Sequence, residues 1–169
     1  MPPIRLAILE ADTPLPGVDA HYHGYYGVFS HLFTRAVAPA PLSSTLALSR
    51  HDVVNDLTSY PALDAIDAIL ITGSKHSAFE DTEWIVALVD FVRRAFALAP
   101  SSGHPPLRII GVCFGHQIVS RALGVPVRRA EAGWEVSVTE TKLTLAGQAL
   151  FDGRETLVCF FSPPSPRFL

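Results

Sequence analysis

Short apolar runs alternate along the chain with segments in which apolar residues recur at helical spacing. The clearest runs predict buried strands over residues 4–9, 65–72 and 107–112. The helical spacing predicts helices over residues 28–37, 84–95 and 114–123. Strands that alternate with helices in this way are typical of α/β proteins, so we expect a doubly wound, mostly parallel sheet.

The remaining segments are less regular. Further strands are expected over residues 45–48, 134–139 and 156–161, and a loop over residues 13–27, which are rich in proline and glycine. The last ten residues are Pro-rich and apolar without periodicity. We therefore expect one incomplete domain over residues 1–156, whose sheet lacks its C-terminal strands, and an atypical Pro-rich tail over residues 157–169.

Composition narrows the class of protein. The chain has 169 residues, of which 49% are hydrophobic and 17% charged, so a single folded domain is expected and a disordered chain is excluded. The net charge of −3 comes without a basic stripe, so no nucleic-acid partner is expected. No signal peptide or membrane-length apolar run is present, which indicates no membrane partner and a cytoplasmic location. The two cysteines lack the spacing of a disulfide framework or zinc site, and no cofactor or metal is expected.

Cys113 stands at the most informative position in the sequence. It lies in Gly-Val-Cys-Phe-Gly-His-Gln, residues 111–117, directly after a predicted strand and before a predicted helix. This is the nucleophile-elbow pattern with cysteine in place of serine. The helix N-terminus behind the thiol favours the thiolate, and the Phe114 N–H would face an oxyanion on an attacked carbonyl. The alternative is that Cys113 is a small buried apolar residue in a glycine-shaped turn.

A second loop follows the predicted strand over residues 65–72. It begins with Thr72-Gly73-Ser74, and a glycine at this point can offer its N–H to the same crevice. Sites of open α/β sheets gather at the carboxyl ends of strands, where both loops are expected. The alternative is an ordinary glycine between a strand and a loop.

These motifs, together with Gly133-Trp134-Glu135, resemble class I glutamine amidotransferase domains. The likeness runs from Ile4 to about Gly153. It is strongest to the stand-alone branch that is similar to the glutaminase half of GMP synthase and to the γ-glutamyl peptidases. The resemblance implies a flavodoxin-like fold and a cysteine that attacks a γ-glutamyl amide, giving a thioester that water hydrolyses. The implied substrate is a small molecule, either glutamine or a γ-glutamyl peptide.

The resemblance also implies roles for individual residues. Cys113 would be the nucleophile, and the N–H groups of Gly73 and Phe114 would form the oxyanion hole. Gln117 would hold the glutamyl group, with Ser74 and Trp134 as further substrate-binding residues. His116 follows the nucleophile on the helix, which in the family is not the position of the catalytic histidine.

The pattern departs from the family after the elbow. The family carries its catalytic histidine and glutamate well downstream of the cysteine, whereas none of the seven histidines here follows His116. His21 and His23 follow the first strand and are possible substitutes. Three hypotheses remain: a glutamine amidotransferase-like hydrolase, a non-catalytic or truncated relative that binds a γ-glutamyl ligand or a partner, and a different cysteine hydrolase of flavodoxin-like fold. The sequence identifies no synthetase partner.

Overall fold

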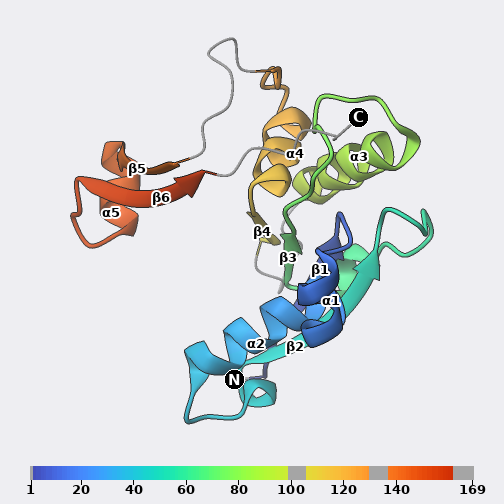
Figure 1. Cartoon of the computed structure of the whole chain (residues 1–169), viewed down its shortest axis with the longest axis horizontal. Helices are drawn as coiled ribbons and strands as arrows, with labels where there is room; N and C mark the ends of the chain where they lie inside the picture. Colours follow the sequence, from blue (N-terminus) through green and yellow to red (C-terminus); the bar gives the residue numbers. More distant parts are fainter. Residues whose placement is uncertain (1, 99–105, 130–136, 162–169) are drawn as a thin grey trace. The chain divides into compact units, whose positions relative to one another are not determined.

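A computed structural model describes residues 2–98, 106–129 and 137–161 of the protein, which divides into two compact units (Figure 1). The first unit covers Met1–Arg128 and the second Arg129–Leu169. The strands of the first unit are β1 (Ile4–Glu10), β2 (Leu46–Asp52), β3 (Ala68–Ile71) and β4 (Arg108–Gly111). Its α-helices are α1 (Pro16–Tyr22), α2 (Tyr25–Val37), α3 (Glu83–Ala97) and α4 (Phe114–Ala122), with short 3₁₀ turns at Leu42–Ser44 and Leu63–Ala65.

The four strands form one parallel sheet in the order β2-β1-β3-β4. Because the strands are parallel, their carboxyl ends lie along one edge of the sheet. The chain moves outward from β1 to β2 and then returns past β1 to β3, so the strand order reverses between β1 and β3. Such a reversal is where doubly wound sheets place their sites. The predicted α/β, flavodoxin-like architecture is confirmed.

The alternation of side chains along the strands builds a core on each face of the sheet. Ala7, Leu9, Ile69 and Ile71 face one side, where they pack with the apolar faces of α3 and α4. The intervening residues Leu6, Ile8, Ala68 and Leu70 face the other side, where Tyr26, Phe29 and Phe33 of α2 cover them. The sheet is therefore packed on both faces by helices, with its loops at the carboxyl ends of the strands (Figure 1).

The predicted loop over residues 13–27 is wrong. Residues 16–22 form α1, and α2 begins already at Tyr25. Pro16 stands in the first turn of α1, where its missing N–H costs nothing, so this proline starts a helix instead of breaking one. The break between α1 and α2 occurs at His23 and Gly24, whose φ values are 56° and 106°. Strand β2 also continues to Asp52, past the predicted end at residue 48.

The second unit contains an antiparallel pair of strands. β5 (Ser137–Lys142) pairs with β6 (Thr156–Phe161), and the short helix α5 (Leu145–Leu150) lies between them in sequence. The predicted strand over residues 156–161 is confirmed, whereas α5 was not predicted. Residues 134–136 of the other predicted strand lie outside the described residues. Among the helices that the structure describes, none is long and apolar enough to cross a membrane.

Tyr60 gives a first prediction, on stability. Its ring packs against Phe91 at 4.6 Å between centroids, and its hydroxyl is buried without a partner among the described residues. Burial raises the pKa of Tyr60 from 10.0 to about 12. The folded state therefore favours the neutral phenol, and stability should fall as pH rises from about 10 towards about 12. Replacing Tyr60 by Phe should remove this fall and raise stability at pH 7 by about 1 kcal/mol. Urea unfolding across this pH range tests both; an unchanged alkaline fall would contradict the assignment.

Candidate active site

Cys113 occupies a sharp turn between β4 and α4. Its backbone has φ 52° and ψ −104°, a conformation that residues other than glycine rarely adopt. Around it, the Gly115 N–H donates to the Val112 carbonyl at 2.9 Å, and the Gln117 N–H donates to the Cys113 carbonyl at 3.2 Å. The thiol is exposed at the start of the helix. The strand, strained turn and helix of a nucleophile elbow are therefore all present.

Packing explains the two glycines that flank Cys113. A β-carbon at Gly111 would lie 2.5 Å from the backbone of Gly115 and His116, because the turn folds back on itself. A β-carbon at Gly115 would lie 2.4 Å from the Ile71 carbonyl oxygen, because α4 begins directly against β3. The close packing of this turn thus requires glycine at both positions that flank the cysteine in the Gly-x-Cys-x-Gly pattern.

The loop after β3 lies beside the elbow, as expected for Gly73. A β-carbon built on Gly73 would come 3.8 Å from the Cys113 β-carbon. Among the described residues, no acceptor is bound by the N–H groups of Gly73, Ser74 and Phe114. These groups are free to bind a carbonyl oxygen at the thiol, while the oxyanion role of Gly73 and Phe114 stays a prediction.

The three predicted substrate-binding residues lie in different parts of the chain. Gln117 is exposed in the first turn of α4, on the same helix end as the thiol. The Ser74 hydroxyl oxygen accepts the His76 N–H at 3.1 Å, so it also shapes its own loop. Trp134 lies outside the described residues. The structure therefore places Gln117 on α4, which begins directly after Cys113, and Ser74 on the loop after β3.

None of the described histidines forms a hydrogen bond or ion pair with Cys113. His76 packs edge-on against Trp84 at 5.2 Å between ring centroids, and Trp84 in turn packs on Phe114 at 5.6 Å. His116 is exposed on α4, and His21 contacts the Tyr22 ring. Within the described residues, the site thus contains an exposed thiol and N–H groups that bind no acceptor, and no histidine there forms a hydrogen bond or ion pair with the thiol.

Asp12 and Tyr25 belong to the surroundings of the thiol, although the sequence did not point to them. Asp12 follows β1 and accepts the Lys75 backbone N–H at 2.7 Å and the Lys75 Nζ at 2.6 Å, which ties the loop after β3 to β1. Burial raises the pKa of Tyr25, and electrostatic interactions with Asp12 and Cys113 raise it further. The only available signal was that both residues follow the first strand, near its carboxyl end.

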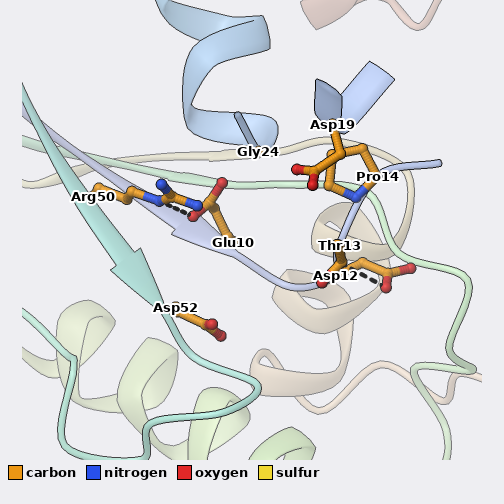
Figure 2. A pocket seen from close by; sticks show the side chains of 8 residues that line it. All are labelled: Glu10, Asp12, Thr13, Pro14, Asp19, Gly24, Arg50 and Asp52. Carbon is orange, nitrogen blue, oxygen red and sulfur yellow. Dashed lines mark hydrogen bonds and ion pairs between the residues drawn. The ribbon is translucent and has the colours of Figure 1, made fainter. Parts of the chain in front are cut away.

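A small acidic hollow opens beside Asp12 at the carboxyl ends of β1 and β2 (Figure 2). Its volume is about 40 Å³, and four carboxylates and Arg50 line it. Glu10, which is 4% exposed, forms an ion pair with Arg50 and accepts the Tyr26 N–H. Within the described part of the chain, no group of three metal-ligating side chains is arranged to hold a metal ion. The ion pair and the hydrogen bond of Glu10 anchor the start of α2 to the sheet.

Arg121 connects α4 to the far end of the loop after β3. Its guanidinium donates to the carbonyls of Ala78 at 2.9 Å and Glu80 at 2.8 Å, and it pairs with Asp81. The Arg121 side chain is only 23% exposed, and its bond to the Ala78 carbonyl is partly buried, whereas the bonds to Glu80 and Asp81 are exposed. The loop is therefore held at one end by Asp12 and at the other by Arg121.

Replacing Arg121 by Ala should lower the free energy of unfolding by about 1–2 kcal/mol, because two carbonyls lose their donor. Arg93 is the matched control, since it also lies on a helix but, among the described residues, pairs only with Asp90, and both side chains are more than half exposed. Arg93→Ala should cost less than about 0.5 kcal/mol. Urea denaturation of both variants measures the difference; equal losses would show that Arg121 does not hold the loop.

The chain is similar to glutamine amidotransferase-like proteins and to gamma-glutamyl peptidases. It is 36% identical over 156 residues to a glutamine amidotransferase-like protein of Schizosaccharomyces pombe. The aligned region covers 90% of this chain and 60% of that protein. It is 33% identical to a glutamine amidotransferase-like protein of Penicillium rubens, over 88% of this chain and 56% of the relative. It is 31% identical to gamma-glutamyl peptidase 3 of Arabidopsis thaliana, over 79% of this chain and 48% of the relative. No protein-family profile matches the chain.

The chain thus spans between 48% and 60% of the length of these relatives. The likeness nevertheless extends over most of the residues that build the sheet and the cysteine turn. Sequence similarity and strand order agree, and together they support a class I glutamine amidotransferase-like family for this chain.

Proposed function

We propose that the protein is a cysteine hydrolase that cleaves the γ-glutamyl amide of glutamine or of a γ-glutamyl peptide. The observation that carries the proposal is the strained, exposed Cys113 beside a loop with free N–H groups. A thiolate with N–H donors nearby is suited to acyl transfer, because the donors stabilise the oxyanion that forms on the attacked carbonyl. We place the reaction in the cytoplasm, where reducing conditions keep the thiol free.

In the proposed reaction, the Cys113 sulfur attacks the γ-carbonyl carbon and the carbonyl oxygen becomes an oxyanion facing the Gly73 and Phe114 N–H groups. The carbon–nitrogen bond then breaks, and the nitrogen leaves as ammonia or an amine after taking a proton. A water molecule attacks the resulting thioester and releases glutamate and the thiol. Gln117 and Ser74 bind the glutamyl group, and Trp134 stays a further predicted substrate-binding residue.

Mass spectrometry after incubation with glutamine or a γ-glutamyl dipeptide tests this proposal. A γ-glutamyl group should appear on the peptide that contains Cys113 and not on the peptide that contains Cys159, and hydroxylamine should remove it. An α-glutamyl dipeptide is the matched control and should leave both cysteines unmodified. Unmodified Cys113 together with no release of glutamate from any γ-glutamyl substrate would refute the proposal.

A γ-glutamyl-binding protein without turnover is the second candidate. It is favoured by the lack of contact between Cys113 and the described histidines, because general-base assistance contributes about 10²- to 10⁴-fold to such reactions. In this case the thioester accumulates to one group per chain and free glutamate does not increase with time. Continuous release of glutamate identifies the hydrolase instead.

A further inference from the structure

Thr72 bridges the two strands between which the order of the sheet reverses. Its side chain is fully buried at the end of β3, with no exposed surface. The Thr72 N–H donates to the Leu9 carbonyl at 3.1 Å, which extends the pairing of β3 with β1. The Ala11 N–H donates to the Thr72 hydroxyl oxygen at 2.9 Å, so the side chain takes the place of a backbone acceptor.

The Thr72 hydroxyl has a single proton, which it donates to the Gly73 carbonyl oxygen at 3.1 Å. This hydrogen bond is partly buried. Because the peptide unit is planar, a Gly73 carbonyl directed at Thr72 forces the Ser74 N–H to point away from Thr72. Without this bond, glycine would allow the unit to rotate. A rotated unit would present a carbonyl oxygen in place of an N–H and repel an oxyanion.

We infer that Thr72 is a positioning residue, whose hydroxyl holds the Gly73–Ser74 peptide in the orientation that leaves the Ser74 N–H open to a carbonyl bound at Cys113, as a donor beside those of Gly73 and Phe114. This inference rests on the proposed function, since it concerns the acylation of Cys113. Thr72 touches neither the substrate nor the thiol and acts through the adjacent peptide.

Two reactions of the same thiol separate positioning from general support of the fold. Acylation of Cys113 by γ-glutamyl p-nitroanilide passes through an oxyanion and releases p-nitroaniline. Alkylation by iodoacetamide displaces iodide and forms no oxyanion. Thr72→Val keeps the shape of the side chain but removes the hydroxyl, whereas Thr72→Ser keeps the hydroxyl. Both rates are read from the Cys113 peptide by mass spectrometry, and thermal unfolding is followed in parallel.

The Val variant should be acylated about a hundredfold more slowly at saturating substrate, the effect of losing one oxyanion donor. Its half-saturating substrate concentration and its alkylation rate should stay within about twofold of wild type, and the Ser variant should restore acylation. Equal acylation of wild type and Val variant, or a parallel fall in acylation and alkylation, would overturn the role of Thr72 but not the proposed function. A wild-type chain that is alkylated but never acylated would overturn the proposed function together with this inference.

Discussion

Replacing Cys113 by Gly is expected to abolish acylation by γ-glutamyl substrates and, at the same time, to make the fold more stable than the corresponding Ala variant. The loss should exceed about a thousandfold, because no other group at the site can form the thioester. The gain should be about 1 kcal/mol, because at φ 52° and ψ −104° a β-carbon is strained and glycine is not. Activity would thus be obtained at the expense of stability.

The test combines two measurements on the Cys113→Gly and Cys113→Ala variants, with Cys159→Ala as the control that removes the other thiol. Release of p-nitroaniline should be lost in both Cys113 variants and kept in the control. Urea denaturation should place the midpoint of the Gly variant above that of the Ala variant. The reverse order would show that the turn is not strained in solution.

Replacing Gly115 by Ala should cost about 3 kcal/mol of folding free energy, although alanine is normally the better residue in a helix. The added β-carbon would lie 2.4 Å from the Ile71 carbonyl oxygen and 2.8 Å from the Ile71 β-carbon. Both atoms belong to a buried central strand, so they cannot move aside without disturbing the sheet. Either the protein unfolds more readily, or α4 shifts and carries Cys113 away from Gly73.

Gly17→Ala in α1 is the matched control, since no atom lies within 4 Å of a β-carbon at that position. This variant should be neutral or slightly more stable than wild type. Urea denaturation measures both changes, and iodoacetamide alkylation of Cys113 reports whether the turn persists. A Gly115→Ala variant as stable as the Gly17→Ala variant would contradict the close packing of α4 on β3.

The parts of the fold that carry strong local signals could be predicted from the sequence. The strands that became β1, β3 and β4 are continuous apolar runs, as buried parallel strands usually are, and their positions were predicted to within a few residues. The elbow was visible because its glycines are required locally by the turn itself. Helix α1 was missed because its prolines were interpreted as breaks, although one of them occupies the first turn of the helix.

The site was predictable only in part, for a physical reason. Cys113, Gly73 and Gln117 lie in motifs with fixed spacing, and the structure brings Gly73 to Cys113. Asp12 and Arg121 act through hydrogen bonds to loops that are distant in sequence, and no local pattern marks such partners. The strand order determines which carboxyl ends become neighbours, and single-sequence patterns do not contain that order. Trp134 remains a prediction from the resemblance.

The contact between Gly115 and Ile71 has a consequence for the newly made chain. Parallel strands must close long loops before they pair, so this part of the sheet is expected to form slowly. Until β3 and β4 are paired, nothing holds residue 113 in its strained conformation. Cys113 of the newly made chain then has the relaxed backbone of any unfolded residue. The acyl-transfer chemistry proposed for the thiol would therefore begin only after folding, which protects the nascent polypeptide from acylation during its own synthesis.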